Sequence, residues 1–105
     1  MSVPILRIHN AAAKEVSDAK AWYLRRSIKA ARGFADELRR VLNRILDQPL
    51  MGPHYLKGSR RVQLHRYPYL VVYKVHGEVI RIYAVAHTSR RPGYWANRRF
   101  DTEAP

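Results

Sequence analysis

The chain has 105 residues, a length typical of one domain with an ordinary hydrophobic core. Its hydrophobic content of 47% excludes a largely disordered chain, and the absence of cysteine excludes disulfide scaffolds, thiolate zinc sites and cysteine nucleophiles. No apolar run approaches the roughly 20 residues of a membrane-spanning helix, and the first residues do not read as a secretory signal. We therefore expect a single domain over residues 1–105, with a core from about 3 to 99 and a tail over 100–105.

The net charge of +12 is the most informative part of the composition. Fifteen of the 20 basic residues are arginine, whose planar guanidinium binds phosphate or carboxylate through two hydrogen bonds. Residues 57–99 carry ten basic side chains and a single acid, Glu78, whereas residues 1–50 carry ten basic and five acidic ones. Such an excess indicates an anionic partner, either nucleic acid or an acidic protein, unless it serves solubility alone.

The first half of the chain predicts one strand and two helices. Alternation of apolar and polar residues over 3–9 predicts the strand. Small and apolar residues then recur at helical spacing over 11–26, and more strongly over 28–47, at Ala31, Phe34, Leu38, Val41 and Ile45. Asn10 and Ser27 are the expected N-caps, and Pro49 ends the second helix. The short junction between the helices predicts a helical hairpin.

The second half predicts a loop over 48–59, rich in Pro and Gly, and three strands over 60–65, 69–76 and 79–87. Gly77-Glu78 fits a two-residue hairpin turn. The helices should cover the apolar strand face made by Ile80, Ile82, Ala84 and Ala86. The other face would then present basic and aromatic side chains, at Arg81, Tyr83 and His87, with Arg61 and His65 from the neighbouring strand. The fold class is therefore α+β, in the order strand–helix–helix–strand–strand–strand, with a helical hairpin packed on one face of a mainly antiparallel sheet.

The segment over 88–100 interleaves arginines with aromatic residues, which suits single-stranded nucleic acid. The alternative is that Trp95 and Phe100 pack onto the domain. The residues expected to bind a target or an anion are Arg60, Arg61, Arg66, Arg81, His87, Arg90, Arg91, Trp95 and Arg98.

The histidines show no metal-ligand spacing, so we expect no metal and no small-molecule cofactor. RNA can be cleaved without metal by a base, an acid and cations that stabilise the phosphorane. Candidates for such catalysis are His65, His87, Tyr94 and Arg66. The alternative is that His87 hydrogen-bonds a loop and that His65 is an exposed strand residue. The five acids between 15 and 47 are interpreted as surface partners of basic residues on the helices.

Several short segments, in this order and spacing, resemble the RelE/ParE superfamily of bacterial toxins from type II toxin–antitoxin systems over residues 3 to about 99. The segments that carry the resemblance are Ala21-Trp22-Tyr23, Ala30-Ala31-Arg32-Gly33-Phe34, Pro49, Arg60-Arg61-Val62, Arg66-Tyr67-Pro68-Tyr69-Leu70-Val71-Val72-Tyr73 and Ala84-Val85-Ala86-His87-Thr88-Ser89-Arg90-Arg91-Pro92. The resemblance implies a cytoplasmic toxin that is held inactive by a cognate antitoxin.

The superfamily has two kinds of member. RelE-like toxins cleave mRNA on the ribosome and usually carry an arginine just after the aromatic residue of the third strand, where this chain has Leu70. They also often have a basic cluster before the second strand, where this chain has only Lys57. ParE-like toxins inhibit DNA gyrase, and the segments Tyr67-Pro68-Tyr69 and Ala86 to Pro92 look more like that branch.

Three hypotheses follow from the residues and the resemblance. The first is a ParE-like toxin that binds a macromolecular target, DNA gyrase. The second is a ribosome-dependent mRNA endonuclease that uses His65 or His87 as base or acid, Tyr94 as acid and Arg60, Arg61, Arg66 and Arg90 for phosphate. The third is a non-toxic nucleic-acid-binding module. Either toxin needs an acidic antitoxin, which would lay a helix into an apolar groove at the hairpin or add a strand to the sheet edge.

Overall fold

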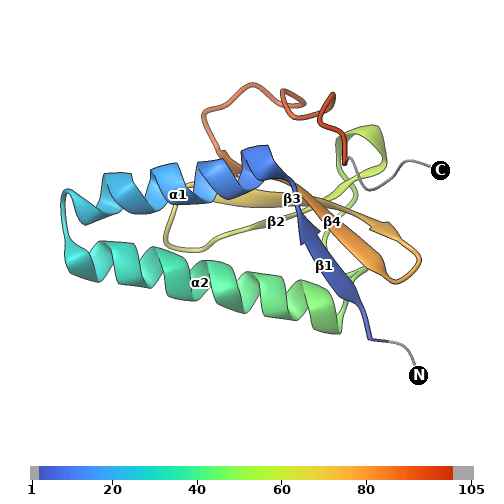
Figure 1. Ribbon diagram of the computed structural model, residues 1–105, viewed down its shortest axis with the longest axis horizontal. Coiled ribbons are helices and arrows are strands. Elements are labelled where there is room, and N and C mark those ends of the chain that lie inside the picture. Colours follow the sequence, from blue (N-terminus) through green and yellow to red (C-terminus); the bar gives the residue numbers. More distant parts are fainter. Residues whose placement is uncertain (1–2, 101–105) are drawn as a thin grey trace.

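The computed structural model describes residues 3–100, which form a four-stranded sheet and two long helices (Figure 1). The sheet has the order β1-β4-β3-β2. Strand β1 (Ile5–Ile8) pairs in parallel with β4 (Val79–His87), and β3 (Tyr69–His76) lies antiparallel between β4 and β2 (Arg60–Gln63). The expected α+β order is confirmed, although β2 ends at Gln63, two residues earlier than predicted.

Helices α1 (Asn10–Leu24) and α2 (Ile28–Asp47) form the predicted hairpin and run side by side in Figure 1. Ser27 caps α2 as expected, because its Oγ accepts a hydrogen bond from the Ala30 N–H at 3.1 Å. The expectation for α1 was wrong by one residue: His9 is the N-cap, and its Nδ1 accepts from the Ala11 N–H at 2.9 Å. No helix within residues 3–100 is long and apolar enough to cross a membrane.

The helices and the sheet enclose the first hydrophobic core. The apolar positions of α2 that recur at helical spacing, Phe34, Leu38, Val41 and Ile45, are all buried there. Gly33 is part of this packing, since a Cβ at that position would lie 2.3 Å from the hydroxyl oxygen of Tyr67. That hydroxyl donates a hydrogen bond to the Ala30 carbonyl oxygen at 3.1 Å. Glycine therefore lets the β2–β3 connection approach α2 closely.

A one-residue irregularity in β4 changes the predicted distribution of its side chains between the two faces. Val72 pairs with Ala84 and Tyr73 with Ile82, so Tyr83 is an extra residue on β4. Such a bulge exchanges the faces of all later residues. Ile80, Ile82 and Val85 face the helix-side core, whereas Ala84 and Ala86 belong to a cluster on the opposite face. The expectation that Ala84 and Ala86 lie beneath the helices is therefore wrong.

Residues 88–100 cover that opposite face and create a second core. Trp95 is only 1% exposed and packs with Leu70, Val72, Tyr83 and the two alanines of β4. The rings of Phe100 and Tyr83 have their centroids 4.9 Å apart. The packing alternative for these two aromatic residues is confirmed. In Figure 1 the segment crosses the molecule on the other side of α1 from α2. The rest of the predicted tail, residues 101–105, lies outside the described residues.

Candidate functional site

A cleft of about 290 Å³ lies on the sheet face opposite the helices, between the strand ends and the segment that follows β4. We name it the arginine cleft after Arg61, Arg90 and Arg91, which line it. No acidic residue is among its lining residues, the rest of which are Tyr55, Gln63, Leu70, Ala86, His87, Thr88, Pro92, Tyr94 and Trp95. Three guanidinium groups that line one cleft favour an anionic ligand, and Arg90 also lines a second cleft with Glu15 and Asp18.

Two of these guanidinium groups are held on aromatic rings. The Cζ atom of Arg90 lies 3.9 Å from the ring centroid of Tyr94, and that of Arg61 lies 4.9 Å from the centroid of Tyr55. Cation–π contacts of this kind restrict a long side chain that would otherwise sample many rotamers. The cleft therefore presents its arginines partly preorganised for phosphate or carboxylate.

His87 lines the same cleft, and one of its ring nitrogens is already in use. Nδ1 accepts a hydrogen bond from the Ser89 N–H at 3.1 Å and lies 2.8 Å from Ser89 Oγ. The neutral ring then carries its proton on Nε2. The predicted loop hydrogen bond of His87 is present, and the ring also packs edge-on against Tyr69, with centroids 5.1 Å apart.

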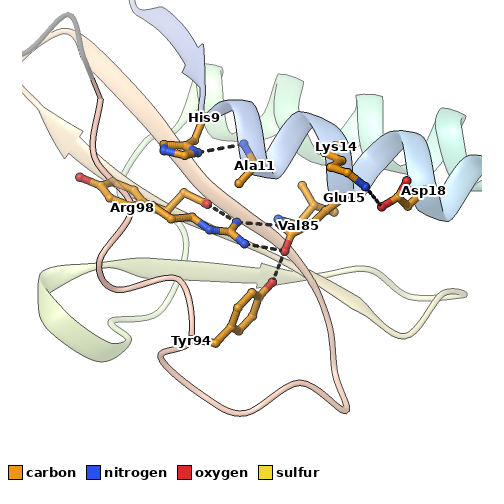
Figure 2. A network of polar contacts seen from close by, with 9 residues as sticks. His9, Ala11, Lys14, Glu15, Asp18, Val85, Tyr94 and Arg98 are labelled. Carbon is orange, nitrogen blue, oxygen red and sulfur yellow. Dashed lines mark hydrogen bonds and ion pairs between the residues drawn. The ribbon is translucent and has the colours of Figure 1, made fainter.

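The ion pair between Glu15 and Arg98 hydrogen-bonds the backbone of β4 beyond the end of its pairing with β1. Pairing with β1 ends at Ile82, so the backbone beyond it has no strand neighbour on that side. The Val85 N–H instead donates to Glu15 Oε1 at 3.1 Å, and Arg98 Nη1 donates to the Tyr83 carbonyl oxygen at 2.9 Å. Glu15 and Arg98 bind each other through two N–O contacts of 3.0 and 2.9 Å (Figure 2). A helix residue and a residue of the final segment thus replace a strand.

The same carboxylate also binds Tyr94. The Tyr94 hydroxyl donates to Glu15 Oε2 at 2.5 Å. Burial raises the pKa of Tyr94, and the hydrogen bond to Glu15 raises it further. The hydrogen bond to Glu15 likewise raises the pKa of Arg98. In this structure the Tyr94 proton and the Arg98 guanidinium are both engaged inside the protein.

The remaining predicted site residues lie elsewhere. Arg60 donates through Nη1 to the carbonyl oxygens of Leu50 and Gly52, at 3.0 and 2.8 Å. His65 and Arg66 line a different cleft, beside α2. The Cζ atom of Arg81 lies 5.9 Å from the ring centroid of Phe100. The structure therefore brings together Arg61, His87, Arg90 and Arg91, with Tyr94 and Trp95 as walls, and separates them from Arg60, His65, Arg66, Arg81 and Arg98.

Two glutamates of structural importance were missed from the sequence. The helix-surface pairing expected of the acids is found for Asp18 with Lys14 and for Asp36 with Arg39. It is wrong for Glu15, described above, and for Glu37, whose buried carboxylate accepts hydrogen bonds from the backbone N–H groups of His65 and Arg66. Their spacing held a signal, because each glutamate falls within the apolar stripe of its helix, where a surface acid would not be expected.

Nothing in the described part of the chain, residues 3–100, groups three or more His, Cys, Asp or Glu side chains in a way that could hold a metal ion. Leu70, at the position where RelE-like toxins usually carry arginine, is 9% exposed and belongs to the second core. The face that would carry that cation is closed by Trp95 at this point.

Comparison with known proteins identifies a family and a similar fold. A family model described as "ParE toxin of type II toxin-antitoxin system, parDE" matches residues 6–92. A solved structure titled "Chromosomal ParDE TA system from P. aeruginosa" has a similar fold, with a TM-score of 0.71 and 18% identity over 81% of this chain and 96% of that chain. No curated protein matches the sequence. The family model spans most of the chain, including both helices, strands β2 to β4 and most of β1, so the chain belongs to the ParE toxin family of type II toxin–antitoxin systems.

Proposed function

We propose that this ParE-type toxin inhibits growth by binding DNA gyrase, and that the arginine cleft is part of the contact surface. The observation that carries the proposal is the cleft itself, which is lined by Arg61, Arg90 and Arg91 and by no acidic residue. A surface of this kind fits an acidic protein patch or a nucleic-acid backbone, both of which a gyrase–DNA complex offers.

The arrangement of the candidate catalytic groups favours binding over RNA cleavage. His65 lies in a different cleft from His87, the Tyr94 proton is engaged by Glu15, and Leu70 replaces the arginine expected in a RelE-like nuclease. General acid–base catalysis needs an acid and a base within reach of one reacting phosphate. His87 shares its cleft with Arg61, Arg90 and Arg91, whereas His65 lines the cleft beside α2 together with Arg66 and the buried Glu37.

The test is inhibition of gyrase supercoiling, and formation of gyrase cleavage complexes, by the purified protein. We expect inhibition by the unmodified chain and weaker inhibition by the double variant Arg90→Ala, Arg91→Ala. The matched control is Arg25→Ala, Arg32→Ala, which removes the same charge from exposed positions of the helical hairpin, the C-cap of α1 and the first half of α2. A supercoiling reaction that continues at saturating toxin would rule out gyrase as the target.

We also propose that an acidic antitoxin segment neutralises the toxin. A mostly apolar cleft of about 310 Å³ lies between the helices and β4, with Lys20 and Arg39 among its lining residues. This combination suits the apolar face of an acidic amphipathic helix. The edge strands β1 and β2 offer a second mode, addition of a strand. An acidic reading frame beside the gene, whose product co-purifies with this chain and restores growth, is the expected result.

The alternative function is a ribosome-dependent mRNA endonuclease, and the observation in its favour is that His87 shares a cleft with Arg61 and Arg90. It predicts transcript cuts after induction, abolished by His87→Ala. Intact mRNA in primer extension would exclude it. Expression without an antitoxin that leaves growth untouched would instead favour a non-toxic nucleic-acid-binding module.

A further inference from the structure

Glu15 connects parts of the chain that are far apart in sequence. Its two carboxylate oxygens accept hydrogen bonds from the Val85 N–H, the Tyr94 hydroxyl and two nitrogens of Arg98. The donors come from β4 and from the segment that covers the second core, whereas Glu15 itself lies on α1. The side chains of Glu15 and Arg98 are 17% and 16% exposed, so solvent screens this pair less than it screens the surface pairs.

Such a carboxylate is held strongly in place by its partners. Hydrogen bonds between ionised groups are roughly twice as strong as neutral ones, and the two parallel contacts with Arg98 fix the guanidinium plane. Removing the charge would leave the largely buried side chain of Arg98 opposite a neutral group, and would deprive the Tyr94 hydroxyl of its ionised acceptor. Glu15 therefore holds the segment 94–98 through polar contacts, in addition to the packing of Trp95 in the second core.

The connection continues from Glu15 into the arginine cleft. Glu15 accepts a hydrogen bond from the Tyr94 hydroxyl, and the Cζ atom of Arg90 lies 3.9 Å from the centroid of the Tyr94 ring. Tyr94 is also one of the walls of the cleft, next to Trp95. A shift of the tyrosine ring would move Arg90 and change the distance between the cleft's cationic groups.

We propose that Glu15 is the positioning residue of the arginine cleft. Its hydrogen bonds to Tyr94, Arg98 and the Val85 N–H fasten residues 94–98 to β4, and they thereby hold the Arg90 guanidinium where it can bind an anionic ligand. That the cleft serves a target rests on the proposed function, whereas the fastening itself does not. Glu15 does not touch the ligand. It acts through the side chains that it holds.

The fastening is tested with Trp95 as a reporter. In a Trp22→Phe background Trp95 is the remaining tryptophan, and its side chain is buried in the second core. We expect Glu15→Gln to raise acrylamide quenching of its fluorescence and to shift the emission to longer wavelength. The matched control is Glu78→Gln, the same change of group and net charge in the exposed β3–β4 turn, and it should leave both unchanged.

The positioning is tested by binding of a fluorescein-labelled oligothymidine as the anionic probe. We expect Glu15→Gln to weaken binding about tenfold relative to Glu78→Gln, as loss of charged hydrogen bonds implies. A second variant, Tyr94→Phe, keeps the ring but loses the bond to Glu15, so it should also weaken binding. Its control is Tyr67→Phe, which loses a tyrosine hydroxyl and its hydrogen bond to the Ala30 carbonyl oxygen on the helix side.

Each result decides the proposal. If Glu15→Gln shows the same acrylamide quenching as Glu78→Gln, Glu15 does not fasten residues 94–98. If quenching increases but the affinity for oligothymidine stays unchanged, Glu15 does not position the arginine cleft. If Glu15→Gln loses its helical circular dichroism, Tyr94→Phe against Tyr67→Phe decides instead. The probe is independent of gyrase, so a toxin that fails to inhibit gyrase would refute the proposed function while these measurements still stand.

Discussion

A carboxylate that is largely shielded from water destabilises a fold unless its oxygens find donors, and Glu15 and Glu37 both find them in groups from distant parts of the chain. The side chain of each glutamate extends from its helix and hydrogen-bonds a segment without regular secondary structure. This segment is residues 94–98 for Glu15 and the β2–β3 connection for Glu37. Helical spacing could have indicated that the Glu37 side chain is buried and that the Glu15 side chain is partly buried. Their partners could not have been predicted, because they lie 28 to 83 positions away along the chain.

At the residue scale, Tyr94 makes folding stability sensitive to alkaline pH. Burial and the bond to Glu15 raise its pKa in the folded protein, whereas in the unfolded chain the hydroxyl ionises near pH 10. Above about pH 10 the folded state therefore binds more protons than the unfolded state. The contribution of Tyr94 to the free energy of unfolding is complete below that pH and is lost as the pH rises towards the pKa of the folded protein. Tyr94→Phe should therefore lose stability less steeply than the unmodified chain between about pH 10 and about pH 11.

The slopes of the free energy of unfolding against pH should differ between the two proteins by a fraction of ~1.4 kcal/mol per pH unit. That value corresponds to one full proton, and Tyr94 is only half-buried. The free energy of unfolding from urea titrations measures it. Between about pH 7 and about pH 9 the two proteins should show parallel pH dependence. Parallel curves above about pH 10 as well would contradict the assigned role of Tyr94.

At the scale of elements, local patterns were enough to predict most of the fold. The helical spacing from Ala31 to Ile45 gives α2 with its bounds, and Gly77-Glu78 gives the turn, in which Gly77 has a φ of 61°. The bulge at Tyr83 could not be predicted, since the β4 segment alternates smoothly and the extra residue is defined only against its partner strand. For the same reason the arginine cleft was only partly predicted: the side chains that share it depend on strand faces that a single bulge exchanges.

The β2–β3 connection should depend on α2 through Glu37, which is 7% exposed. Glu37→Gln keeps one acceptor oxygen, so one of the N–H groups of His65 and Arg66 loses its partner. We expect a loss of ~1–3 kcal/mol in the free energy of unfolding, and faster amide exchange at these two residues. The neighbouring change Asp36→Asn, in an exposed ion pair, should cost less than ~1 kcal/mol. Equal losses in both variants would show that Glu37 does not hold this connection.

At the scale of the whole molecule, the positive charge has a definite location. Half of the basic side chains lie within residues 57–99, and the structure gathers three of them in one cleft. The charge count alone indicated an anionic partner but not where it would bind. The folded chain separates the arginines of the cleft from Arg60 and Arg98, which are engaged by other groups of the protein.

This location predicts a specific salt dependence. For single-stranded oligothymidine, the slope of log K against log salt should become shallower by about 2 when Arg61, Arg90 and Arg91 are all changed to Ala, since each phosphate contact contributes about 0.7. Changing Arg25, Lys29 and Arg32 to Ala removes the same charge from the exposed end of the hairpin and should alter the slope little. Equal effects of the two triple variants would mean that the probe responds to net charge and not to the cleft.

The extra residue in β4 also has a consequence for how the molecule opens. The sheet has apolar side chains on both faces, because Ala84 and Ala86 join Leu70 and Val72 of β3 on the face away from the helices, and each face is closed by a different part of the chain. A layer that covers one face can detach while the other stays packed, so local opening and global unfolding become separate events with separate free energies. The domain therefore has three layers, and we expect the segment over 88–100, which contains no helix or strand, to open at a lower free energy than the helical hairpin.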